Sequence, residues 1–127
     1  MICLMDSHAW IEYLDGSAKG KTVQQLLLRK EKLVTMECCL AELKGFCLRH
    51  EIDVDSFLGI VRVNSVVLPV LEEHWLAAAE IKVRMRKKQP SFGLIDALLI
   101  AKQNQLNCKI VTGDPHFKGL KNVVFLN

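Results

Sequence analysis

Two acidic side chains lie in predicted helices among apolar residues, where a carboxylate is hard to accommodate. The residues three and four positions away from Asp96, and likewise from Glu42, include no cation, although these are the neighbours that a carboxylate meets on a helix. Burying an unpaired carboxylate costs several kcal/mol or more. Each of these acids therefore needs a proton, a counter-charge from elsewhere in the fold, or a metal ion.

Two further acids follow apolar runs that are typical of buried strands. Asp6 comes directly after the run at residues 2–5, and Asp114 follows the run at residues 108–112. Ligands of open parallel sheets bind at the carboxyl ends of the strands. We therefore expect these two acids and the two helical acids to converge at one edge of a sheet.

Converging carboxylates indicate a hard divalent cation and the chemistry of phosphate esters. Carboxylates that share a site repel one another, and a divalent ion among them removes that repulsion. All-oxygen ligation favours Mg²⁺ or Mn²⁺, whereas zinc prefers cysteine and histidine. Such an ion lowers the pKa of a bound water, orients it, and stabilises charge on the leaving oxygen of a phosphodiester.

Simpler roles for the four acids remain open. Asp6 and Asp114 each precede a predicted helix start, and Pro115 suits the first position of a helix, so each acid can be an N-cap. Glu42 and Asp96 lie on solvated faces if the helix boundaries differ from those predicted. One shared metal site explains all four positions together, which the separate roles do not.

Short apolar runs alternate with longer amphipathic segments along the chain, which is typical of a parallel sheet covered by helices on both faces. We predict strands at residues 2–5, 33–36, 65–70, 108–112 and 123–126. We predict helices at residues 8–14, 17–30, 37–50, 53–63, 72–88 and 91–105, the last with Ser91 near its N-cap. The pattern indicates a three-layer α/β/α sandwich with one domain over residues 1–127.

The composition is that of an ordinary globular protein. The chain has 127 residues, half of them hydrophobic, and a formal net charge of +3, which permits an anionic partner without requiring one. The five cysteines are odd in number and form no CxxC pair, so we expect reduced core residues. No basic leader and no apolar run of about 18 residues is present, so we predict neither a signal peptide nor a membrane span and expect a cytoplasmic protein.

A basic segment precedes the Asp96 helix. Between Glu80 and Asp96 the chain contains no acid, and its cations include Arg84, Arg86, Lys87 and Lys88. These cations are either a rim that contacts RNA phosphates beside the acids or a solvated group that complements a helix C-terminus. His8 and His116 stand near the proposed ligands and are either phosphate contacts or polar surface residues.

Four motifs in order resemble the PIN domain, and within it the VapC-like toxins. They are MICLMDSHAWIEYL at the start, LAELKG in the middle, FGLIDALLIA after the basic segment, and IVTGDPHF followed by NVVFL at the end. The resemblance covers the whole chain. Each motif is short, and the specificity comes from their order and spacing.

The resemblance implies a five-stranded parallel sheet and an endoribonuclease that depends on Mg²⁺ or Mn²⁺. It implies that Asp6, Glu42, Asp96 and Asp114 form the acidic cluster that binds the metal, and that Ser7 and Thr112 support the acids or the metal-bound waters. VapC-like proteins usually form homodimers and are neutralised by a VapB-type antitoxin, which places a basic side chain among the acids. The sequence departs from the commonest pattern at His116, where many relatives carry another acid.

The leading hypothesis is therefore a metal-dependent endoribonuclease that acts on RNA as the toxin of a VapBC-type toxin–antitoxin pair. Asp6, Asp96 and Asp114 bind the metal in this hypothesis, and Glu42 completes the cluster or positions the attacking water. One alternative is a non-catalytic PIN-like module that binds RNA or a protein through the basic rim. Another is a nuclease of housekeeping RNA processing.

Overall fold

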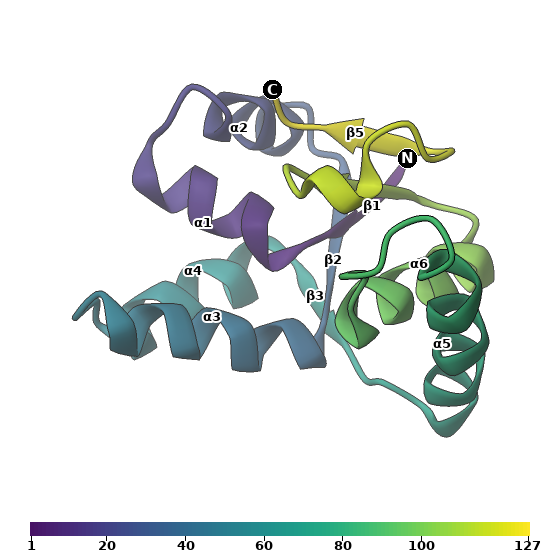
Figure 1. Ribbon diagram of the computed structural model, residues 1–127. Helices are drawn as coiled ribbons and strands as arrows, with labels where there is room; N and C mark the ends of the chain where they lie inside the picture. Colours follow the sequence, from purple (N-terminus) through teal and green to yellow (C-terminus); the bar gives the residue numbers. More distant parts are fainter.

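A parallel sheet of five strands forms the middle layer of the protein (Figure 1). The computed structural model describes residues 1–127. The strands are β1 (Ile2–Met5), β2 (Lys32–Met36), β3 (Val66–Leu68), β4 (Lys109–Thr112) and β5 (Val123–Phe125), arranged in the order β3-β2-β1-β4-β5. All four neighbouring pairs are parallel. The predicted α/β sandwich is confirmed.

Six helices cover the two faces of the sheet. Four of them form the hydrophobic core of one face, and two cover the other face. The first group is α1 (Ser7–Asp15), α2 (Gly20–Leu28), α3 (Glu37–Arg49) and α4 (Val54–Asn64). The second group is α5 (Glu72–Met85) and α6 (Leu94–Leu106). None of these helices is long and apolar enough to span a bilayer.

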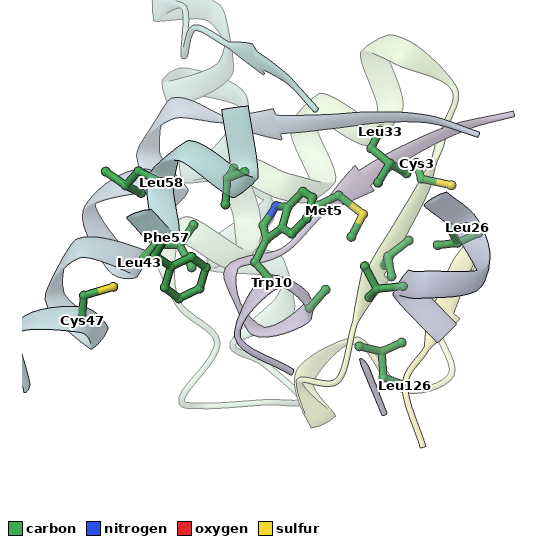
Figure 2. Packing of buried hydrophobic residues seen from close by; sticks show 14 residues of the cluster. Cys3, Met5, Trp10, Leu26, Leu33, Leu43, Cys47, Phe57, Leu58 and Leu126 are labelled. Atoms are coloured by element: carbon green, nitrogen blue, oxygen red, sulfur yellow. The ribbon is translucent and has the colours of Figure 1, made fainter. Parts of the chain in front are cut away.

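The core on the four-helix side fixes the position of α1. Trp10 is fully buried and lies in the middle of this core (Figure 2). Its Nε1–H donates a hydrogen bond of 3.0 Å to the Thr35 hydroxyl on β2, which satisfies the one polar atom of the ring. Because Trp10 ties α1 to the sheet, the first turn of α1 and its Ser7 are held at the end of β1.

The core on the other face fixes α6. Successive strand residues point to opposite faces, so Leu4 and Ile110 face this side and pack with Leu99 of α6. Ala97 and Ala101 pack against Ala78 and Ile81 of α5. These small residues allow the two helices to approach closely, and their packing places the first turn of α6 beside the ends of β1 and β4.

Three helix boundaries differ from the predicted ones by three residues, and the others by no more than two. The second helix begins at Gly20 rather than residue 17, because the Ser17 hydroxyl accepts the Gly20 N–H before the helix starts. The fifth helix ends at Met85 rather than residue 88, because residues 86–88 form a turn closed by the Gln89 N–H on the Met85 carbonyl. The sixth begins at Leu94, not near Ser91, and Gly93 occupies its N-cap.

The strand order reverses at β1. The chain leaves β1 toward β2 and β3 on one side, and β4 and β5 lie on the other side. Such a switch point opens a crevice outside the carboxyl ends of the two strands, where ligands of open α/β sheets bind. Asp6 follows β1, and Asp114 comes two residues after the end of β4.

Candidate metal centre

Asp6 is the most deeply buried acid of the site, with 4 % of its surface exposed. It occupies the N-cap position of α1 in extended conformation, but its side chain makes no capping hydrogen bond. The carboxylate instead accepts a bond of 2.7 Å from the Thr112 hydroxyl at Oδ2 and lies 3.3 Å from the Ser7 hydroxyl at Oδ1. The simple capping role considered for Asp6 is therefore wrong, because two hydroxyls bind the carboxylate and no backbone N–H of α1 does.

Two hydroxyl side chains join the acids to one another. The Ser7 Oγ lies 2.9 Å from Glu42 Oε1 as well as 3.3 Å from Asp6 Oδ1, so one hydroxyl proton serves two carboxylates. The Thr112 Oγ1 donates to Asp6 and accepts the Asp114 backbone N–H at 2.9 Å. The sequence resemblance implied supporting roles for Ser7 and Thr112, and these are the contacts that each of them makes.

Glu42 reaches the same place from α3. It is an exposed residue of the second turn, and the end of its side chain turns toward Ser7. Ligand atoms of Asp6, Glu42 and Cys39 all lie within 4.8 Å of one another. A hydrogen bond with Cys38, burial, and the charges of the nearby acids raise the pKa of the Cys39 thiol, so this sulfur stays protonated and Asp6 and Glu42 supply the hard donors.

Asp96 and Asp114 form a second group with His116. The ligand atoms of these three residues also lie within 4.8 Å of one another. Asp96 Oδ2 accepts the Gly93 N–H at 3.0 Å and lies 3.0 Å from His116 Nδ1. Asp114 Oδ1 lies 3.5 Å from the same nitrogen. Asp114 also caps the short helix η1 (Pro115–Phe117) by accepting the His116 N–H at 2.9 Å, so the capping role holds for this acid.

The His116 contact is the one that sequence reasoning did not anticipate. The spacing around Asp96 showed that its partner had to come from outside its own helix, and His116 is that partner. The signal available in the sequence was Asp-Pro-His at the end of a strand, because a proline after Asp114 predicts a short capped turn that keeps His116 close to the acid. His8, the other candidate, is exposed, and its side chain makes no hydrogen bond to these acids.

The two groups of acids share one electrostatic environment. Burial raises the pKa of Asp6, and the charges of Asp96 and Asp114 raise it further, while the Thr112 hydrogen bond works in the opposite direction. Partial burial raises the pKa of Glu42, and the charges of Asp6 and Asp96 add to this effect. Because the charges of the second group raise the pKa of acids in the first, the two groups are close enough to repel, and a divalent cation among them would relieve that repulsion.

The sequence profile of the PIN domain matches residues 3–123. The chain belongs to the PIN domain family. Among curated proteins, none matches the chain significantly in sequence.

Solved structures of VapC20, VapBC2 and a further toxin–antitoxin complex have the same fold as this PIN domain. VapC20 of Mycobacterium tuberculosis, described as a Sarcin-Ricin loop cleaving toxin, is 18 % identical with a TM-score of 0.80, over 98 % of this chain and 99 % of that one. VapBC2 of Rickettsia felis, solved bound to a DNA fragment from their promoter, is 17 % identical with a TM-score of 0.73, over 98 % and 97 %. A toxin–antitoxin complex of Klebsiella pneumoniae is 16 % identical with a TM-score of 0.69, over 98 % of each chain.

The basic segment of the PIN domain lies next to the second acidic group. Arg86 Nε donates to the Phe92 carbonyl at 2.8 Å, and Gln89 of the same connection donates to the His116 carbonyl at 3.0 Å. Arg86, Lys87 and Lys88 are exposed, so their charges are available to an anion. Arg84 is also exposed and lines a separate surface hollow with Gln103 and Lys121.

The donor set of this site fits a divalent cation. Four carboxylates supply hard oxygen ligands, two hydroxyls orient them, and no lysine or arginine forms an ion pair with any of them. Mg²⁺ and Mn²⁺ are the ions that such oxygen sites bind. These residues can therefore hold one or two such ions, together with a water molecule, at the edge of the sheet.

Proposed function

We propose that this PIN domain is a metal-dependent endoribonuclease and the toxin of a VapBC-type toxin–antitoxin pair. The observation that carries the proposal is that the charges of Asp96 and Asp114, in one acidic group, raise the pKa of Asp6 in the other. Such repulsion is tolerated where it serves a cation. The cofactor of the proposal is Mg²⁺ or Mn²⁺.

Each acid of the cluster has a defined task in this proposal. Asp6, Asp96 and Asp114 bind the metal, and Glu42 completes the cluster or holds the attacking water by accepting one of its protons. When bound, the ion activates this water and neutralises charge on the scissile phosphate. Ser7 fixes the Glu42 carboxylate, and Thr112 holds Asp6 against the end of β4, so the ligands are arranged before the substrate arrives.

RNA is the proposed substrate. The exposed cations Arg86, Lys87 and Lys88 precede Gln89, which contacts His116, and they suit the phosphates of an RNA strand. The structural neighbour from Mycobacterium tuberculosis is described as a Sarcin-Ricin loop cleaving toxin, which supports the same class of substrate. With RNA as its substrate, the protein would act in the cytoplasm.

A VapB-type antitoxin is the proposed partner. Structural neighbours of the chain were solved as VapBC or toxin–antitoxin complexes. We expect such a partner to place a basic side chain among the four acids, where it would replace the metal as their counter-charge. A homodimer is also part of the proposal, and the exposed apolar side chains of Trp75, Leu76 and Val83 on α5 suit a protein interface.

The test is RNA cleavage by Asp96→Asn in the presence of Mg²⁺ or Mn²⁺. The variant keeps the size of the side chain and the Gly93 contact, but it removes one ligand charge, and we expect cleavage to fall to background. Glu80→Gln is the matched control, because Glu80 is an exposed acid on α5 and its loss should leave cleavage unchanged. Cleavage by Asp96→Asn at the parental rate would refute the nuclease assignment.

Removal of the divalent ions in the same cleavage assay distinguishes the nuclease from a non-catalytic RNA-binding module. A binding module would bind RNA equally well after chelation of all divalent ions and would cleave none. A nuclease loses cleavage on chelation and regains it when Mn²⁺ is restored. A neighbouring reading frame for a small antitoxin would favour a toxin over a nuclease of housekeeping RNA processing.

A further inference from the structure

We infer that His116 is a ligand of the metal held by Asp96 and Asp114, and that it makes this site prefer Mn²⁺ over Mg²⁺. The inference rests on the proposed nuclease function and concerns which ion that site takes. Asp6 and Glu42 offer oxygen ligands alone. The second acidic group, Asp96 and Asp114 with His116, offers both oxygen and nitrogen ligands. His116 is the only imidazole that touches any of the four acids.

The distances in the second group are those of neighbouring ligands on one ion. His116 Nδ1 lies 3.0 Å from Asp96 Oδ2 and 3.5 Å from Asp114 Oδ1. Ligands placed about 2.1 Å from a metal are separated by about 3.0 Å at the edge of an octahedron and about 3.4 Å at the edge of a tetrahedron. A cation can therefore be bound by all three atoms with only small side-chain movements.

The imidazole ring is held in place before any ion binds. Ser91 Oγ lies 2.9 Å from His116 Nε2, and the ring packs on Phe92 with 5.6 Å between ring centroids. The backbone N–H of His116 is bound to Asp114, and its carbonyl is bound to Gln89. Ordering of the ring therefore costs little additional entropy when it becomes a ligand.

Ser91 can bind the Nε2 of the ring whether that nitrogen accepts or donates the hydrogen bond. With Nδ1–H donating to Asp96 Oδ2, Nε2 accepts the Ser91 hydroxyl proton. With Nδ1 as a metal ligand, the ring proton resides on Nε2 and donates to Ser91 Oγ. Because a hydroxyl both donates and accepts, Ser91 stabilises either tautomer.

The nitrogen changes which ion the site prefers. Mg²⁺ takes oxygen ligands and keeps its waters, whereas imidazole binds the later divalent metals of the first transition row, and Mn²⁺ already binds N/O sites more tightly than Mg²⁺ does. A third carboxylate in the place of His116 would give an all-oxygen set that suits Mg²⁺. The ring should therefore raise the affinity ratio of Mn²⁺ to Mg²⁺.

The decisive experiment is pulsed electron paramagnetic resonance of the Mn²⁺-loaded full chain, with ¹⁴N and with ¹⁵N-labelled histidine. A coupled histidine nitrogen is expected in the wild type and in His8→Gln, and it should be lost in His116→Gln. His50 and His74 are not competing ligands, since His50 stacks on Phe46 and both ring nitrogens of His74 are bound, to Leu71 and Gln105. If His116→Gln fails to fold, coupling retained in His8→Gln still assigns the nitrogen to His116.

Calorimetric titration gives the second readout. We expect His116→Asp to lower the ratio of Mn²⁺ affinity to Mg²⁺ affinity by about tenfold or more, since even the partners of ligands change affinity by 10 to 100-fold. Bound Mn²⁺ without a coupled histidine nitrogen, or an unchanged ratio in His116→Asp, would overturn the inference and leave the nuclease proposal standing. A wild-type chain that binds no Mn²⁺ would overturn both.

Discussion

The Thr112 hydroxyl donates a hydrogen bond of 2.7 Å to Asp6 Oδ2, although the two residues are 106 positions apart in the chain. The bond joins the end of β4 to the end of β1, the two strands between which the order of the sheet reverses. The same hydroxyl accepts the Asp114 N–H. One buried side chain thus sets the distance between two acids that come from opposite ends of the sequence.

Replacing Thr112 by valine should weaken both the fold and the site. The Val side chain has nearly the same shape but leaves the Asp6 carboxylate and the Asp114 N–H without their shared partner, which costs about 1–3 kcal/mol of unfolding free energy. Because the Thr112 hydrogen bond lowers the pKa of Asp6, its loss should also reduce Mn²⁺ affinity. Urea denaturation and calorimetry measure the two effects, and Thr112→Ser, which keeps a hydroxyl, should recover most of each. Equal losses in the serine and valine variants would contradict the role given to the hydroxyl.

Asp6 should make the metal-free protein less stable as pH rises. Burial and the charges of Asp96 and Asp114 raise the pKa of Asp6 above the value of about 3.9 that an unfolded chain has. Between these two pKa values the folded state binds more protons than the unfolded state, so the free energy of unfolding falls as pH increases. Above the raised pKa this destabilisation is fully present.

Asp6→Asn isolates this effect because an amide does not titrate. The stability of the variant minus that of the wild type should grow with pH through the window above about 3.9 and then level off. Loss of the Asp6 charge also removes one cause of the raised pKa of Glu42, which acts in the same direction. Urea denaturation in EDTA at a series of pH values measures the difference. A difference that stays constant with pH would show that the Asp6 carboxyl is not destabilised when it ionises.

The layers of the fold and the edge that holds the acids follow from local sequence patterns. Short apolar runs such as residues 2–5 alternate with amphipathic segments, and this alternation leads to a covered parallel sheet. Parallel strands end at a common edge, so Asp6 and Asp114 could be placed near each other from their position after two strands. These conclusions needed no knowledge of which strands are neighbours.

The partner of Asp96 could not be predicted in the same way. Its contact with His116 depends on how the connection between α5 and α6 folds back over η1, which is a tertiary property. Ser91 illustrates the difficulty, because a serine before an apolar run is a good N-cap, whereas here its hydroxyl is bound to the His116 ring. Gly93 takes the N-cap position and gives its N–H to Asp96.

Divalent ions should stabilise the wild type through the acidic cluster. A ligand that binds only the folded state adds about 2.7 kcal/mol at a hundredfold excess over its Kd, so melting in saturating Mn²⁺ should shift upward by several degrees. Asp96→Asn should lose most of this shift. Without metal it should melt at or above the wild-type temperature, because the substitution removes one of the repelling charges. Glu80→Gln should behave like the wild type, and a shift of the same size in Asp96→Asn would place the ion elsewhere.

RNA affinity should depend on the exposed cations beside the second acidic group. Lys87 and Lys88 follow the end of α5 and are exposed, and removal of one cation that binds a phosphate should reduce the slope of log affinity against log salt by about one. Lys87→Ala combined with Lys88→Ala should therefore weaken binding of a single-stranded RNA and lower this slope by about two, measured on the cleavage-deficient Asp96→Asn background. Lys19→Ala is the control, since Lys19 is an exposed cation before α2. An unchanged salt slope in the double variant would mean that these cations only complement the C-terminus of α5.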